Sequence, residues 1–285
     1  MDVAKILRVK PGRRMVLKDH DPAETLGFQG KSEIEAALQA DCDRLKDLQL
    51  RLHVEGARSL LICLQGCDAS GKDGVVEKLF AAFNPAGCRV VSFKQPSVQE
   101  KAHDFLWRYH AAAPPHGEIC VFNRTHYESV LVERVQSLAP KRVWSQRYAL
   151  LDAFEQTLAE NGTSVVKLFL HISADEQLER FKARLDDPMK RWKISEADYS
   201  ERKLWPAYAK AFSDMLRRTS GKLAPWYVIP ANNKWFRDFA VLRIVADRLE
   251  AMRLPLPAPQ VDLDDIRRKY HAAERDAAQG DATNG

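Results

Sequence analysis

The chain has 285 residues, of which 45% are apolar and 29% charged, a balance that suits a globular protein with a sizeable core. Its net charge of +5 at pH 7 is compatible with a polyanionic partner and equally with an ordinary enzyme. No apolar run is long enough to span a bilayer, and residues 1–18 alternate charged with single apolar residues, which argues against a secretory signal peptide.

Residues 1–30 are basic and show no regular period, so we expect an arm laid over the rest of the chain. A helix is predicted to begin at Ser32, the expected N-cap, with Glu35 placed to complete a capping box. The apolar face of this helix recurs every three or four residues, at Leu38, Cys42, Leu45 and Leu48.

Short apolar runs bounded by turn residues predict five strands, at residues 60–64, 89–93, 119–122, 165–172 and 226–229. Helical patterns are expected at residues 72–83, 102–110, 143–160 and 236–252. Strands that are apolar on both faces and alternate with helices predict an α/β fold, with a five-stranded parallel sheet covered by helices on both faces.

The composition changes around residue 254, where the run LPLPAPQ is proline-rich and extended. An exposed helix is expected over residues 262–278, and residues 279–285 are expected to be disordered. We therefore divide the chain into an N-terminal arm (1–30), a main domain (31–254) and a partly disordered C-terminal extension (255–285).

The strongest local motif is GCDASGKDG at residues 66–74, which has the GxxxxGK pattern between a strand and a helix. Its glycines let backbone N–H groups curl around an anion, the helix N-terminus adds partial positive charge, and a lysine adds a full one. A glycine-rich turn that binds nothing is disfavoured, because the lysine is in register. The expected phosphate contacts are Gly66, Ala69, Ser70, Gly71 and Lys72.

Two acids in this motif are unusual. Asp68 lies inside the loop, where a carboxylate would repel an anion unless a metal ion bridges them, so it is predicted to hold Mg²⁺, with Mn²⁺ as an alternative, or to orient the nucleophilic oxygen. Asp73 replaces the usual Ser or Thr after the lysine; an acid that complements the helix dipole is favoured there over a phosphate or metal role.

The third strand ends at Asn123, where a P-loop enzyme usually has a metal-binding Asp. Because the carboxyl ends of parallel strands face the site, Arg124 is predicted to neutralise charge on a transferred group, with Glu128 one turn further on. The alternative is a surface ion pair between Arg124 and Glu128. Further cations would together form a basic track for a long polyanion: Lys94, Arg134, Lys141 and Arg142.

Residues 174–200 are predicted to form a lid that closes over phosphates and excludes water. They combine an amphipathic helix with the basic run KRWK at residues 190–193. A helix fixed by an ion pair between Glu176 and Arg180 is an equally open alternative. Three aromatic residues after the lid are expected in the core rather than as base-stacking platforms: Trp205, Tyr208 and Phe212.

The five cysteines form no CxxC pair, and Cys63 and Cys120 lie in apolar runs, where a free thiol behaves as a small hydrophobe. This pattern predicts a reducing, cytoplasmic setting.

Several long runs resemble the polyphosphate kinase 2 family, in particular the branch called class III: GCDASGKDG, NPAGCRVVSFKQP, AHDFLWRYH, GEICVFNRTHYESVLVERV, KLFLHIS and APWYVIPANNKW. The resemblance covers roughly residues 30–252. It implies a thymidylate-kinase-like P-loop kinase fold with a lid. It also implies Mg²⁺-dependent phosphoryl transfer between inorganic polyphosphate and nucleotides, commonly in a homo-oligomer, here a dimer or tetramer.

The same resemblance makes Asp68 the catalytic acid and Lys72 the phosphate-binding lysine of the loop. It associates Glu128 with acceptance of nucleoside monophosphates as well as diphosphates. Two arginines are implied in the phosphate path, Arg124 and Arg134, and one in the lid, Arg184. Ser129 departs from the branch, because an acid is expected at that position.

We therefore expect reversible transfer of the terminal phosphoryl group of polyphosphate to AMP and ADP. Adenine nucleotides are the expected partners, and guanine nucleotides are left open. No nucleic-acid or membrane partner is expected. The alternatives are an ATP-dependent nucleotide kinase and a non-catalytic polyphosphate-binding module. A GTPase is disfavoured, because the run NNKW at residues 232–235 lacks the Asp that reads guanine.

Overall fold

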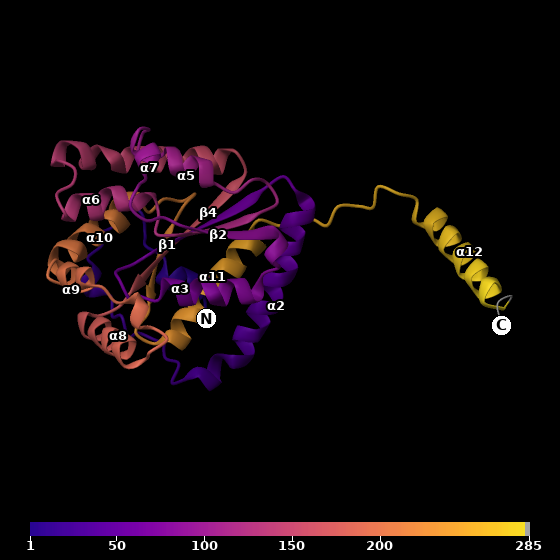
Figure 1. Ribbon diagram of the computed structural model, residues 1–285, viewed down its shortest axis with the longest axis horizontal. Helices are drawn as coiled ribbons and strands as arrows, with labels where there is room; N and C mark the ends of the chain where they lie inside the picture. Colours follow the sequence, from indigo (N-terminus) through magenta and orange to yellow (C-terminus); the bar gives the residue numbers. More distant parts are fainter. Residues whose placement is uncertain (283–285) are drawn as a thin grey trace. The chain divides into compact units, whose positions relative to one another are not determined.

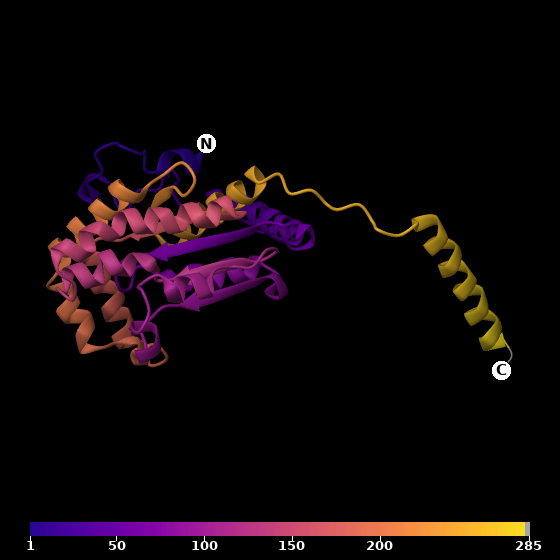
Figure 2. The same ribbon diagram turned by 90° about the horizontal axis from the view of Figure 1, so that it is seen from above.

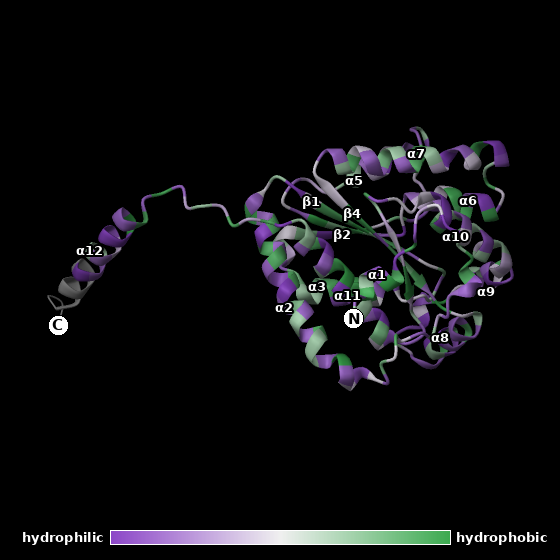
Figure 3. Ribbon diagram, turned by 180° about the vertical axis from the view of Figure 1, so that it is seen from behind, coloured by the Kyte–Doolittle hydropathy of each residue, from purple (hydrophilic) through white to green (hydrophobic). Residues whose placement is uncertain are grey.

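Five parallel strands form the centre of the structure, as the apolar runs predicted (Figure 1). They are β1 (Ser59–Gln65), β2 (Cys88–Ser92), β3 (Ile119–Asn123), β4 (Thr163–His171) and β5 (Trp226–Pro230), in the spatial order β2-β3-β1-β4-β5. All seven residues of β1 are buried, and the central strands appear as apolar ribbons in Figure 3. The predicted five-stranded parallel α/β sheet is confirmed; its strand order had not been predicted.

This computed structural model describes residues 1–282 and divides the chain into two units, Met1–Leu254 and Pro255–Gly285. Within residues 1–282, no helix combines the length and the apolar character needed to cross a membrane.

Helices cover both faces of the sheet. One face packs against α2 (Lys31–Glu55), α3 (Lys72–Ala82) and α11 (Lys234–Ala251). The other face packs against α5 (Trp107–Ala112), α7 (Lys141–Glu160) and α10 (Trp205–Thr219). Alternate residues of each strand enter the two cores; Leu60 and Ile62 face α2 and α11, whereas Leu61 and Cys63 face α7. This alternation is why the strands are apolar throughout.

The N-terminal arm packs along the sheet edge and α10 (Figure 2). It contains α1 (Val3–Leu7) and the short 3-10 helix η1 (Leu17–Asp19). The backbone N–H of Val9 donates to Trp226 O at 2.9 Å, and that of Leu17 donates to Ser213 Oγ at 3.0 Å. The first bond joins the arm to the start of β5, and the second holds η1 against α10, where Leu17 and Lys18 reach the cavity described below.

Two helix predictions were wrong in detail. The N-cap of α2 is Gly30, so Ser32 lies inside the first turn and its predicted capping box does not form. The helix expected over residues 102–110 is replaced by α4 (Val98–Lys101) and α5, separated by a turn. The cause is local, because Ser97 and Glu100 form a capping box for α4, and Asp104 Oδ1 accepts the backbone N–H of Leu106 just before α5.

The remaining elements of the first unit are short, apart from α8 (Ala174–Asp186). They are η2 (Pro85–Gly87), η3 (His126–Val130), α6 (Val132–Val135), η4 (Arg191–Lys193) and α9 (Glu196–Arg202). The predicted lid residues 174–200 therefore form α8, η4 and most of α9.

The second unit contains α12 (Leu263–Ala282), which is longer than the predicted helix. The disorder expected from residue 279 is therefore wrong for residues 279–282, and the expectation for residues 283–285 lies outside the described residues.

Candidate active site

A cavity of about 700 Å³ opens at the carboxyl ends of the strands. Its walls come from residues that follow β1, β2 and β3, from the end of β4, and from α9, α10 and η1. The connection from β3 to β4 crosses over β1, so the strand order changes direction at β1, the position where open α/β sheets bind ligands.

The predicted phosphate loop lies between β1 and α3 and forms part of this wall. Its backbone is left-handed at Ala69, with φ of 61°, and at Gly71, with φ of 99°. A Cβ atom at Gly71 would lie only 2.0 Å from Nη1 of the buried Arg237, so only glycine fits there. The loop is therefore fixed both by its own backbone geometry and by a buried arginine behind it.

Lys72 turns its amine into the loop. Nζ donates to Gly66 O at 2.9 Å and to Cys67 O at 3.0 Å, and the residue is 9% exposed. Burial lowers the pKa of Lys72, and the nearby Asp68 carboxylate partly opposes this effect. Lys72 therefore lies inside the loop of residues 66–72 and does not line the cavity.

Two side chains from α8 support the loop from behind. Gln177 Nε2 donates to Asp68 O at 2.9 Å, and Arg180 Nη1 donates to Ala69 O at 2.9 Å. Arg180 is buried and also forms the expected ion pair with Glu176, at 2.7 Å. The start of the predicted lid is therefore a fixed support. Apart from the polar face of α8, no pattern in the sequence indicated these contacts.

Arg124 and Asp68 meet at the edge of the cavity. Arg124 Nη2 lies 2.8 Å from Asp68 Oδ1, and both residues line the cavity. Burial opposes the charge on Arg124, but the carboxylates of Glu128 and Asp68 outweigh it and raise the pKa of Arg124. The partner of Arg124 is thus the loop acid, and the alternative of an Arg124–Glu128 surface pair is not what forms.

Glu128 also lines the cavity, but its hydrogen bond comes from the end of β1. Gln65 Nε2 donates to Glu128 Oε1 at 2.6 Å, and Gln65 Oε1 accepts from Thr125 Oγ1 at 3.0 Å. The next residue, Ser129, is buried and donates to His126 O at 2.7 Å. A serine at this position therefore serves the turn itself.

Asp73 joins three segments on the outer side of the loop. Its Oδ1 accepts from Asn123 Nδ2 at 3.1 Å, and its Oδ2 lies 3.0 Å from Lys193 Nζ of η4. Burial would raise the pKa of Asp73, but its bonds to Lys193 and Asn123 outweigh that and lower it. Neither Asp73 nor Asn123 lines the cavity.

The other predicted cations divide into two groups. Lys94 lines the cavity, whereas Arg134 and Arg184 do not. Arg134 pairs with Asp214 at 2.9 Å and lies over the ring of Trp144, and Arg184 lies over Phe181 in α8.

Two lysines that the sequence analysis did not single out also line the cavity. Lys18 from η1 and Lys101 from α4 line it together with Lys94, and none of the three forms an ion pair with the described side chains. The arm was predicted to cover the domain, but no motif marked Lys18. The aromatic residues expected in the core also reach the cavity: Trp205, Tyr208 and Phe212 all line it, and only Phe212 is fully buried.

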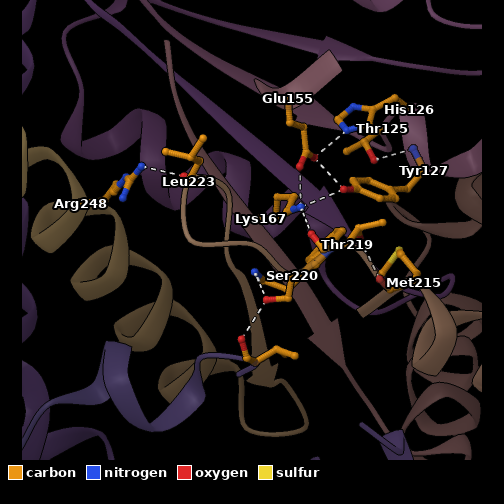
Figure 4. A network of polar contacts seen from close by, with 12 residues as sticks. Thr125, His126, Tyr127, Glu155, Lys167, Met215, Thr219, Ser220, Leu223 and Arg248 are labelled. Atoms are coloured by element: carbon orange, nitrogen blue, oxygen red, sulfur yellow. Dashed lines mark hydrogen bonds and ion pairs between the residues drawn. The ribbon is translucent and has the colours of Figure 1, made fainter. Parts of the chain in front are cut away.

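A buried polar network lies beneath η3 (Figure 4). Lys167 Nζ on β4 lies 2.6 Å from Glu155 Oε2 on α7 and donates to Tyr127 Oη at 2.8 Å. Tyr127 Oη and His126 Nε2 both donate to Glu155 Oε1, at 2.7 and 3.0 Å. Burial lowers the pKa of His126, which keeps its ring neutral, so Glu155 carries the charge that balances Lys167. This network fixes η3, the element that carries Glu128.

A metal site could form here only with ligands from the substrate. Among the described residues, no group of three or more His, Cys, Asp or Glu side chains is arranged to hold a metal ion. Mg²⁺, however, commonly binds through one or two carboxylates together with phosphate oxygens and water. The partly exposed Asp68 carboxylate at the cavity wall fits that mode of binding.

Comparison with known proteins places these features in a family. A family model described as Polyphosphate kinase 2 (PPK2) matches residues 29–256. The chain is 45% identical to the AMP/ADP-polyphosphate phosphotransferase of Meiothermus ruber, over 92% of this chain and 98% of that protein. It is 39% identical to the ADP-polyphosphate phosphotransferase of Rhodopseudomonas palustris, over 89% and 92%. The crystal structure of Polyphosphate Kinase 2 from Arthrobacter aurescens TC1 superposes with a TM-score of 0.91 at 40% identity, covering 95% of this chain and 96% of that one.

Proposed function

The chain belongs to the polyphosphate kinase 2 family, and from this premise we propose how its cavity moves phosphoryl groups. The protein is a polyphosphate:nucleotide phosphotransferase that phosphorylates AMP and ADP from polyphosphate. The residue roles rest above all on the Arg124–Asp68 pair at 2.8 Å, which sets a cation and a metal-binding acid beside the phosphate loop.

The donor site is the loop at residues 66–72. A terminal phosphoryl group of polyphosphate enters the loop and accepts hydrogen bonds from its backbone N–H groups, including those of Ala69 and Gly71. The N–H of Ser70, which donates to Cys67 O at 3.2 Å, would have to exchange that carbonyl for a phosphate oxygen. Lys72 then exchanges the carbonyls of Gly66 and Cys67 for phosphate oxygens. The buried Arg180 and Gln177 keep the loop in shape while this exchange takes place.

The acceptor phosphate attacks in line from the side of Arg124 and Glu128. Arg124 stabilises the negative charge that spreads over the transferred group, and Glu128 contacts the acceptor and allows AMP as well as ADP to be phosphorylated. Asp68 would hold a Mg²⁺ ion, or Mn²⁺ in its place, whose charge would neutralise the donor and acceptor phosphates together. Catalysis is therefore mainly positioning and electrostatic stabilisation, and the reaction runs in both directions.

The chain of polyphosphate beyond the loop follows the lysines in the cavity wall, Lys18, Lys94 and Lys101. Arg134 is left out of this path, because Asp214 and Tyr148 already engage its guanidinium. The lid is the part of residues 174–200 beyond the fixed start of α8; Arg184 belongs to it, and Lys193 ties it to Asp73.

The decisive experiment supplies purified protein with AMP, Mg²⁺ and polyphosphate and omits ATP. ADP should form, and a nucleotide kinase that requires ATP as donor would form none. Asp68→Ala should abolish turnover while polyphosphate still binds, because the loop backbone and Lys72 remain. Unchanged turnover in Asp68→Ala would refute the role given to this acid.

Three further properties belong to the same proposal. A homo-oligomer, dimer or tetramer, is supported by large apolar side chains that the single chain leaves exposed, among them Leu138 and Trp192, and light scattering would measure it. Guanine nucleotides are proposed as additional acceptors, to be compared with adenine nucleotides in the same assay. A cytoplasmic location is supported by five cysteines that are free thiols.

A further inference from the structure

The side chain of Gln65 joins three parts of the cavity floor. Gln65 ends β1 immediately before the phosphate loop, is 2% exposed and lines the cavity. Its Nε2 donates to Glu128 Oε1 at 2.6 Å, and its Oε1 accepts from Thr125 Oγ1 at 3.0 Å. One amide thus connects the strand before the loop with the turn after β3 and with the acid on η3.

Thr125 and Glu128 together determine which way this amide points. Its Oγ1 accepts the backbone N–H of Tyr127 at 3.2 Å, so its single hydroxyl proton is available for Gln65 Oε1. Because the Glu128 carboxylate can only accept hydrogen bonds, the amide turns its NH₂ group toward Glu128 and its oxygen toward the Thr125 hydroxyl. The bond engages Oε1 of Glu128 and leaves Oε2 without a hydrogen bond to the described residues.

We propose that Gln65 is a positioning residue that sets the preference between AMP and ADP, by holding the Glu128 carboxylate in one orientation toward the acceptor. This inference rests on the acceptor role proposed above for Glu128. A glutamate side chain has several rotamers, and a hydrogen bond to a charged group shifts such an equilibrium by about ten-fold to a hundred-fold.

The phosphate contacts of the donor do not depend on this amide. Lys72 is held by Gly66 O and Cys67 O, and Arg124 by Asp68. The pairing of β1 with β3 and β4 uses the backbone of Gln65 and its neighbours rather than the side chain. Loss of the amide should therefore change acceptor selection and leave polyphosphate binding in place.

The test compares Gln65→Met with Gln49→Met. Gln49 is equally buried at 2% and its amide also uses both ends, with Asn84 O at 3.2 Å and Asn84 N at 3.0 Å, but it lies on α2 away from the cavity. Steady-state rates are measured for AMP and for ADP at saturating polyphosphate, together with the KM for polyphosphate and the melting temperature. Gln65→Met should lower kcat/KM for AMP relative to ADP by about ten-fold, with the polyphosphate KM unchanged. Gln49→Met should lower stability and keep the AMP-to-ADP ratio.

Two further variants keep the test decisive. Gln65→Glu preserves the shape of the side chain but sets a carboxylate against Glu128, so it should shift the ratio at least as far, and it serves if the Met variant does not fold. In a Glu128→Gln background, Gln65→Met should cause no further shift, because the two residues act as a unit.

If Gln65→Met lowers kcat/KM for AMP and for ADP by the same factor, so that their ratio stays unchanged as in Gln49→Met, the inference is overturned and the proposed function stands. Failure of the unaltered protein to make ADP from AMP and polyphosphate would instead refute the proposed function itself.

Discussion

Lys167→Met tests how strongly the buried network supports the site. Lys167 and Glu155 are 0% and 4% exposed in their side chains, so removal of the lysine leaves the Glu155 carboxylate buried without its counter-charge. Breaking a buried ion pair in this way costs about 3–5 kcal/mol. At about 2–4 °C per kcal/mol for a domain of this size, the melting temperature should fall by roughly 6–20 °C.

The assay is thermal unfolding followed by circular dichroism, with phosphoryl transfer measured at a temperature where the variant is folded. Activity should fall as well, because Glu155 anchors His126 and Tyr127 of η3. Lys46→Met, on the exposed side of α2, is the matched control and should change stability by no more than about 0.5 kcal/mol. Glu155→Gln added to Lys167→Met should restore part of the loss. If Lys167→Met melts like Lys46→Met, the network does not stabilise the fold as argued.

Three further predictions follow from the site. Burial lowers the pKa of His171 from 6.5 to about 4, so between pH 6.5 and 4 the unfolded chain binds a proton more readily than the folded one. The free energy of unfolding should therefore decrease by up to about 3 kcal/mol as the pH falls from 6.5 to 4. Urea unfolding should show that the free energy of unfolding of His171→Gln depends less steeply on pH in this range. Lys18→Ala should raise the KM for polyphosphate by about five-fold at low salt and leave the melting temperature unchanged, whereas Lys10→Ala, outside the cavity wall, should change neither value. Equal KM values for the two variants would remove Lys18 from the path. Asn123→Asp should set a second carboxylate beside Asp73 and lower kcat by about ten-fold. Adding Asp73→Asn to the same chain should restore part of the lost kcat. If the single variant Asn123→Asp is fully active, the two positions are not coupled.

The sequence predicted the features that depend on neighbouring residues. The loop between β1 and α3 could be predicted because its geometry depends on glycines within nine consecutive residues, 66–74. Each strand could be recognised because burial on both faces requires an unbroken apolar run. The helix over residues 102–110 was wrong for the converse reason: Ser97 and Asp104 offer the backbone local hydrogen bonds that compete with a continuous helix.

The contacts that orient the site could not be predicted in this way. Gln65 and Glu128 are 63 residues apart in the chain, and Asp68 O and Gln177 are 109 apart. Their meeting depends on strand order and register, which the apolar runs did not specify. The ion pair of Arg134 has the same long-range origin, since its partner Asp214 lies 80 positions away on α10.

The distribution of charge explains how acids and cations coexist at the loop of residues 66–74. Asp68 is balanced by Arg124 at 2.8 Å, and Asp73 by Lys193 at 3.0 Å, so the two acids of the loop region each have a cation supplied by a different segment. In the mechanism proposed above, a phosphate bound in the loop would compete with Asp68 for Arg124, and Asp68 would then be free to bind a divalent metal ion. Under that proposal, binding of the donor phosphate and of the metal ion would be linked through the Arg124–Asp68 ion pair, which would make an acid inside an anion-binding loop compatible with phosphate binding.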